Sequence, residues 1–208
     1  MKGKLKIIPA LSDNYIYELT GKEGSLLIDP GEKIPAPENL LAILLTHHHS
    51  DHTAAAASYN VPMIGPDNPP EEFTLGGFFI KTIATPGHTR DSKCYYLPEE
   101  KLLFSGDTLF AAGCGRLFEC DAATLYDSLQ KLKEIPDDTR ICCGHNYLKK
   151  NLEFAQTIEP ENTEIRKRLQ NLTEEEPPTL KLEKQTNPFL RAKSVEEFAL
   201  IRKKRDQL

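Results

Sequence analysis

The sequence predicts an α/β protein in which a strand-rich part precedes a small helical part. Short β-type runs separated by turns predominate as far as residue 143, interrupted by a helical pattern between residues 121 and 132. After residue 145 the apolar residues recur at helical spacing, and Leu148, Leu152, Ala155 and Ile158 share one helical face. We therefore expect one domain over residues 1–145 and a helical domain over residues 146–208.

Strands are expected wherever β-type residues lie between turn formers. The run 40–45 is apolar throughout and predicts a buried strand, followed by a helix-prone stretch at Ala54–Ala57. Gly76-Gly77 is typical of a hairpin turn. The remaining predicted strands are 5–9, 14–19, 25–29, 61–64, 78–83, 93–97, 102–104 and 140–143.

Helix boundaries are indicated by capping residues. Asp121 is a predicted N-cap for a helix whose apolar residues run to Leu132, with Pro136 beyond its end. A charged helical pattern covers 161–172, and 174–178 has the composition of a linker. Ser194 and Glu197 have the spacing of a capping box in front of the last helix.

Composition excludes several classes of protein. The chain of 208 residues carries 26 basic and 31 acidic side chains, a formal charge of −5, which disfavours a nucleic-acid partner. The longest apolar run is 40–45, too short to cross a membrane, and no apolar stretch of secretory length follows the first lysines. The five cysteines have no regular spacing, so we expect them to be reduced. A cytoplasmic monomer is the expectation.

Four of the six histidines lie between residues 46 and 52, directly after the buried strand 40–45. His47 and His49 are two residues apart and point the same way from extended backbone, whereas His48 points elsewhere and is predicted not to be a ligand. Asp51 and His52 begin the next helix and aim at a second point nearby. Imidazole nitrogen mixed with carboxylate oxygen suits Zn, Fe or Mn.

Three further turns have the same layout of strand, glycine and ligand. Gly87 precedes His88, Gly106 precedes Asp107, and Gly144 precedes His145, as expected where the backbone must make a close approach. A single histidine more often has a structural role than a functional one, but a structural role does not explain why the same arrangement recurs in several segments. The residues therefore predict a metal site.

The window Thr46-His47-His48-His49-Ser50-Asp51-His52 resembles the THxHxDH motif of the metallo-β-lactamase superfamily. Further stretches resemble the glyoxalase II family within it, namely 14–17, 29–31, 85–89, 106–110, 113–119 and 187–191. The resemblance implies a metallo-β-lactamase αββα sandwich, followed by a small C-terminal helical domain that binds glutathione.

The same resemblance implies a pair of divalent ions, zinc first, with iron or manganese as alternatives. Carried over by motif position, the first ion takes His47, His49 and His88, the second takes Asp51, His52 and His145, and Asp107 bridges them. A hydroxide between the ions would attack the thioester of S-D-lactoylglutathione and release D-lactate and glutathione, as in methylglyoxal detoxification. Asp51 and Asp107 are thereby the catalytic carboxylates.

Glutathione carries two carboxylates, and the resemblance implies partners for it in Arg116, Phe118, Tyr147, Arg202 and Arg205. Phe118 has no hydroxyl where some relatives carry tyrosine, and Arg205 stands where lysine is expected. The alternative for the basic run 201–206 is a solvated helix end that complements the helix dipole.

Three other functions fit the sequence less well. A persulfide dioxygenase of the same superfamily would hold one iron through His47, His88 and Asp107; the stretch 187–191 and the basic C-terminus disfavour it. A nucleic-acid phosphodiesterase conflicts with the acidic balance of charge. A metal-binding scaffold without catalysis is disfavoured because ligand types stand at all seven motif positions.

Overall fold

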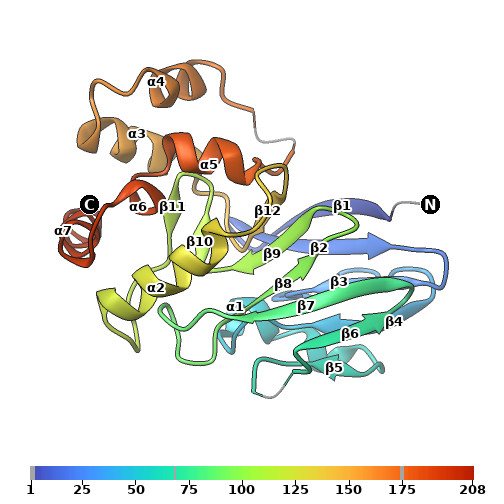
Figure 1. Ribbon diagram of the computed structural model, residues 1–208. Helices are drawn as coiled ribbons and strands as arrows, with labels where there is room; N and C mark the ends of the chain where they lie inside the picture. Colours follow the sequence, from blue (N-terminus) through green and yellow to red (C-terminus); the bar gives the residue numbers. More distant parts are fainter. Residues whose placement is uncertain (1–2, 68, 174–175) are drawn as a thin grey trace.

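Two five-stranded sheets pack face to face in the computed structural model, which describes residues 3–67, 69–173 and 176–208 (Figure 1). The first sheet has the order β1-β2-β3-β4-β5, with β1 at Lys4–Ala10, β2 at Asn14–Thr20, β3 at Ser25–Ile28, β4 at Leu40–Leu44 and β5 at Met63–Ile64. The second has the order β12-β9-β8-β7-β6, with β6 at Glu72–Leu75, β7 at Phe78–Ala84, β8 at Lys93–Leu97, β9 at Leu102–Gly106 and β12 at Arg140–Cys143.

Strand direction brings distant turns to one edge of the sandwich. Strand β9 pairs parallel with β12 and antiparallel with β8, which is antiparallel to β7, so β7, β9 and β12 all run the same way. The turns that follow these three strands therefore emerge together. They are the turns that contain His88, Asp107 and His145.

Both faces of each sheet pack against other elements. Between the sheets, apolar side chains such as Leu26, Leu44, Ile80 and Phe104 are almost fully buried. The outer face of the first sheet carries α1 (Ser50–Thr53) and the 3₁₀ turn η1 (Ala56–Ser58). The outer face of the second packs on α2 (Ala122–Lys133). These four layers are the predicted αββα sandwich.

The C-terminal helices, orange to red in Figure 1, gather at one end of the sandwich beside the hairpin of β10 (Leu109–Phe110) and β11 (Gly113–Cys114). They are α3 (Leu148–Ile158), α4 (Thr163–Gln170), α5 (Leu180–Thr186), α6 (Pro188–Arg191) and α7 (Val195–Asp206). Asp121 and Ser194 cap α2 and α7 as predicted, each accepting a hydrogen bond from the backbone N–H three residues on.

Several elements differ from the sequence-based expectation. Strand β6, the two-residue strands β10 and β11, and the short helices α5 and α6 were not predicted, because elements of this length are stabilised by packing rather than by local pattern. The strand expected at 61–64 is confined to β5, and helix-prone Ala54–Ala57 contributes only to η1. The predicted linker 174–178 lies partly outside the described residues, at 174–175.

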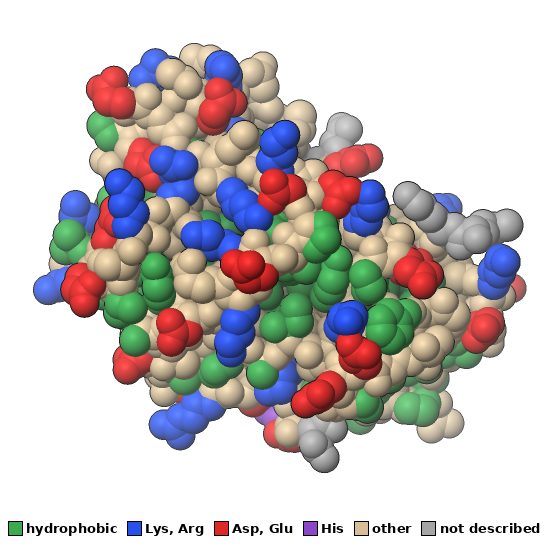
Figure 2. Space-filling model, viewed as in Figure 1, with side chains coloured by type: hydrophobic (Ala, Val, Ile, Leu, Met, Phe, Trp, Pro, Cys, Tyr) green, Lys and Arg blue, Asp and Glu red, His purple; other side chains and the backbone are tan. Residues whose placement is uncertain are grey.

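Surface charge is mixed. Figure 2 shows Lys and Arg interspersed with Asp and Glu over the face drawn, with apolar side chains between them. Among the described residues, no helix combines the length and the apolar character needed to cross a bilayer.

Candidate active site

Seven predicted ligands, drawn from five separate segments, converge at one end of the sandwich. The segment after β4 supplies His47 and His49, and α1 supplies Asp51 and His52. The turns after β7, β9 and β12 supply His88, Asp107 and His145. The resulting groups of possible metal ligands are His47 with His49 and His88, His47 with His52 and Asp107, and Asp51 with His52 and His145.

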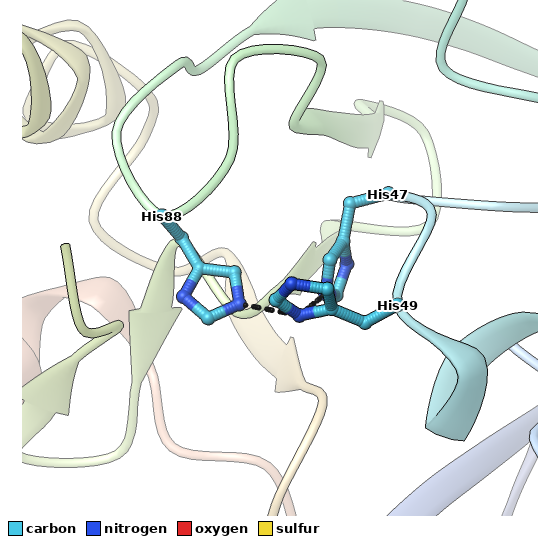
Figure 3. A group of neighbouring side chains, drawn as sticks. All are labelled: His47, His49 and His88. Atoms are coloured by element: carbon cyan, nitrogen blue, oxygen red, sulfur yellow. Dashed lines mark hydrogen bonds between the residues drawn. The ribbon is translucent and has the colours of Figure 1, made fainter. Parts of the chain in front are cut away.

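The first group is formed by three imidazoles whose inner nitrogens nearly touch (Figure 3). Nδ1 of His49 lies 3.2 Å from Nε2 of His47 and 3.0 Å from Nε2 of His88. His47 and His49, two residues apart in the segment after β4, both direct their rings toward one point beside His88 (Figure 3).

The second group faces the first across Asp107. Nε2 of His145 lies 3.4 Å from Nε2 of His52 and 3.3 Å from Oδ2 of Asp51. The carboxylate of Asp107 lies 3.3 Å from each of these two histidines and 3.5 Å from His88 Nε2. Asp107 is therefore the carboxylate that touches both groups.

Outer hydrogen bonds fix the direction of the ring nitrogens. Nδ1 of His52 meets Asp29 at 3.0 Å and Nδ1 of His145 meets Asp13 at 2.9 Å. Nδ1 of His88 meets the Arg116 carbonyl at 3.0 Å, an acceptor that requires an N–H there. With one proton held on Nδ1, Nε2 is the nitrogen of each ring that faces inward and can present its lone pair to a metal ion.

Two more of the predicted ligands, His47 and Asp51, are held in the same way. The hydroxyl of Thr46 donates to Asp29 and lies 3.0 Å from Nδ1 of His47. The side-chain amide of Asn14 donates to Oδ2 of Asp51 at 3.0 Å and to the backbone carbonyl of Asp51 at 3.2 Å. This contact orients the carboxylate and the start of α1 together.

The geometry fits divalent cations. Ligands about 2.0–2.1 Å from a tetrahedral ion lie about 3.3 Å from one another, close to the nitrogen–nitrogen separations observed here. Oδ1 of Asp107 is buried and has no hydrogen-bond partner among the described residues, a costly state for a carboxylate oxygen unless it binds a cation. The site is therefore a divalent-metal site.

Without metal ions, the surroundings of His145 and His52 favour their protonated forms, whereas those of His47 favour the neutral form. Burial lowers the pKa of His145, but hydrogen bonds to Asp107, Asp51 and Asp13 outweigh it and raise the value to about 10. Burial also lowers the pKa of His52, but the carboxylates of Asp107 and Asp29 outweigh this effect. Together they raise the pKa well above its usual value. Burial lowers the pKa of His47 to about 3, so this ring is neutral at physiological pH.

These shifts predict that metal binding releases protons. At pH 8 the metal-free protein holds a proton on His145, since its pKa is about 10, and a metal ion must displace it. Affinity is thus expected to rise with pH up to about 10, by about tenfold per unit for each proton released. Calorimetric titration of the metal-free protein with metal, in buffers of different ionisation enthalpy, measures the number of protons released. Release of no proton at pH 8 would contradict the predicted role of His145 as a ligand.

A cleft of about 590 Å³ opens beside the ligands. Carboxylates and histidines of the predicted metal site line its inner end, and the more exposed side chains of Arg116, Lys150 and Arg205 line its outer part. The lining residues are Asp13, His49, Asp51, His88, Asp107, Phe110, Cys114, Arg116, Phe118, His145, Tyr147, Lys150, Asn151, Arg202, Arg205 and Leu208. All five predicted substrate contacts are among them.

Arg202 and Arg205 differ in their burial and in their contacts. Arg202 is only 4% exposed, and its Nη1 donates to the carbonyls of Cys114 and Gly115 while Nη2 pairs with Asp206. The alternative of a solvated helix end is wrong for Arg202, whose guanidinium is buried. Arg205 lies over the ring of Phe154 and donates to Asn151, leaving part of its guanidinium facing the cleft.

The other three predicted contacts surround the ligands. Phe118 is 63% exposed, yet its ring lies edge-on to the imidazoles of His49 and His88. Tyr147 stacks on His145 with ring centroids 4.9 Å apart, and burial raises the pKa of its hydroxyl to about 12, so it remains a donor. Arg116 stands at the rim, 60% exposed.

Sequence reasoning missed four supporting residues. Asp13, Asn14 and Asp29 hold predicted ligands by hydrogen bonds, and Lys150 lines the cleft. The signal for Asn14 and Asp29 was present, because both lie in stretches that carry the family resemblance, but their roles depend on contacts with distant segments. His48 lies outside this cluster and contacts the carboxylates of Asp67 and Asp91.

Two family models match the chain. The model of the metallo-beta-lactamase superfamily matches residues 57–145, and the model of the hydroxyacylglutathione hydrolase C-terminus matches residues 146–208. A hydroxyacylglutathione hydrolase from Erwinia tasmaniensis is 40% identical over 98% of this chain and 93% of its own length.

Solved structures share the fold. ETHE1 from Myxococcus xanthus superposes with a TM-score of 0.73 at 25% identity, covering 96% of this chain and 90% of that one. TTHA1623, solved in a di-iron-bound form, superposes with a TM-score of 0.62 at 27% identity, covering 89% of this chain and 99% of that one.

Proposed function

The chain belongs to the hydroxyacylglutathione hydrolases of the metallo-β-lactamase superfamily, and on that premise we propose that it hydrolyses S-(2-hydroxyacyl)glutathione thioesters such as S-D-lactoylglutathione. The products are a 2-hydroxy acid and glutathione, as methylglyoxal detoxification requires. The observation that carries the proposal is a cluster of seven histidine and aspartate ligands that opens into a cleft with a cationic outer part.

We propose two metal positions. The first uses His47, His49 and His88, the second uses Asp51, His52 and His145, and Asp107 serves both. When bound, such ions polarise a carbonyl and lower the pKa of coordinated water to about 7. Zinc is the expected metal, with iron or manganese as alternatives, since the donor set of imidazole and carboxylate suits all three. The di-iron form of TTHA1623 supports two positions.

The residues of the chain divide the remaining tasks. The side chain of Asp51 is fixed by Asn14 and is the acceptor that orients the attacking water. The exposed ring of Phe118 covers the imidazoles of His49 and His88 and keeps bulk water from that side of the thioester. A thiolate leaves readily near neutral pH, so no separate strong acid is required.

Recognition of glutathione is assigned to the outer part of the cleft. Arg116, Tyr147 and Arg205 present donors there, and Arg202 supports the wall by binding the carbonyls of Cys114 and Gly115. In this proposal residues 1–145 form the catalytic domain and residues 146–208 complete the glutathione site. The cytoplasmic location and the monomeric state remain predictions.

The decisive experiment is thiol release from S-D-lactoylglutathione by protein of measured metal content, run beside a thioester without glutathione. We expect turnover that requires metal and prefers the glutathione thioester. Oxygen consumption with glutathione persulfide, in place of thioester turnover, would support the dioxygenase alternative and refute the proposal.

Lys150 is a further predicted contact for a substrate carboxylate. It lines the cleft, and among the described residues no carboxylate lies within ion-pair distance of its ammonium. Lys150→Gln is expected to raise KM about fivefold with little change in kcat, the size of one partly exposed ion pair. Lys149→Gln removes the same charge from the adjacent exposed residue, which does not line the cleft, and should leave KM unchanged. Equal effects of the two substitutions on KM would mean that only the overall electrostatic field of the protein, and not a direct contact with Lys150, affects substrate binding.

A further inference from the structure

A carboxylate with no exposure lies where the C-terminal helices meet the hairpin β10–β11. Oε1 of Glu183 accepts from Arg168 Nη2 at 2.6 Å. Oε2 accepts from the backbone N–H of Ala112 at 2.7 Å and from Asn187 Nδ2 at 3.0 Å. A buried charge is tolerated only when it is paired and hydrogen-bonded in this way, so the contacts are specific.

The hairpin turn that Glu183 contacts is conformationally unusual. Ala112 has φ +55°, in the left-handed region that residues other than glycine rarely adopt. The side-chain amide of Asn187 donates to the carbonyls of Phe110 and Gly113, on either side of the turn. The turn is therefore held from the helical part of the chain as well as by the two short strands.

The hairpin carries a ring that touches both halves of the candidate site. Phe110 lines the cleft, and its ring lies edge-on to two others. The ring centroids are 5.9 Å apart for His145 and 5.3 Å apart for Tyr147. A shift of the turn would move this ring against one predicted metal ligand and one predicted substrate contact.

We propose that Glu183 is a positioning residue: by accepting the N–H of Ala112, it fixes the hairpin β10–β11 and, through Phe110, the placement of His145 and Tyr147. The helical part thus sets the geometry of the metal site in addition to lining the cleft. The kinetic part of this inference rests on the proposed function, whereas the hydrogen-bond and metal-geometry parts do not.

Two double variants separate the hydrogen bond from the buried ion pair. Both Arg168→Met/Glu183→Gln and Arg168→Met/Glu183→Leu remove the ion pair, but only glutamine retains an acceptor for Ala112. We expect the glutamine variant to keep slow amide exchange at Ala112 in the metal-free protein and near-normal kcat. In the leucine variant we expect fast exchange, a changed visible spectrum of the Co²⁺-loaded protein, and about tenfold lower kcat.

A third variant and a substitution in a surface ion pair serve as controls for an effect that comes only from lost stability. Adding Ala112→Gly to the leucine variant relieves the left-handed strain without restoring the acceptor, so kcat should stay low while the thermal midpoint recovers. Glu159→Gln breaks the more exposed pair with Arg191 in the same part of the chain and should change neither the spectrum nor kcat.

Equal exchange, spectra and kcat in the two double variants would overturn the inference, as would fast exchange with an unchanged spectrum. Recovery of kcat with stability in the Ala112→Gly variant would assign Glu183 a purely structural role. If the unaltered protein hydrolyses no glutathione thioester, the exchange and Co²⁺ measurements still decide the positioning role.

Discussion

Replacing Asp107 by asparagine is expected to lower kcat/KM at least about a thousandfold and to release bound metal. The carboxylate contacts His88 on one side and His52 and His145 on the other, so its charge serves both predicted metal positions. Asparagine keeps the shape but removes the charge that balances the cations. Metal analysis after dialysis, together with thioester kinetics, measures both losses.

Asp67→Asn is the matched control, because this exposed carboxylate contacts His48 outside the site. It should retain full activity and metal content. An Asp107→Asn protein that keeps both metal equivalents and normal turnover would exclude the bridging role of this carboxylate.

The second large effect is expected from a single methyl group. A Cβ at position 144 would collide with Oδ1 of Asp107 and lie 2.6 Å from Cε1 of His52. Gly144→Ala therefore forces two predicted ligands apart, and displacement by a few tenths of an ångström to 1 Å is expected to lower kcat about a hundredfold. Weaker metal binding should accompany the loss.

Gly65→Ala provides the comparison, since a Cβ at position 65 meets no atom within 4 Å. Its kinetics and metal content should match those of the unaltered protein. Normal metal binding by Gly144→Ala would mean that the ligands adjust to the methyl group, and that the close packing around Asp107 is not required.

The sequence predicted those strands and helices whose hydrophobic pattern extends over several residues. The helical face Leu148, Leu152, Ala155 and Ile158 became α3, because its apolar spacing is a local property of the chain. The hairpin β10–β11 was missed, since two residues per strand give no pattern and its turn is held by Glu183 and Asn187 from elsewhere.

The ligand types were also accessible from the sequence, whereas their support was not. His145 was predicted from the glycine before it, but the partner of its Nδ1 is Asp13, which lies 132 residues away along the chain. Asp29 supports His52 from 23 residues away, with no spacing that links the two. Lys150 resembles any solvated lysine until the fold places it in the wall of the cleft.

The sequence by itself determined which side chains stand at the ends of the strands, and thereby the class of chemistry: imidazole and carboxylate donors that suit divalent cations. The tertiary structure alone decided which ring nitrogen faces inward, how far apart the donors lie, and which cationic side chains line the cleft. The physical reason is that side-chain type and periodicity are local, whereas lone-pair direction and pairing are set by contacts between segments that only folding brings together.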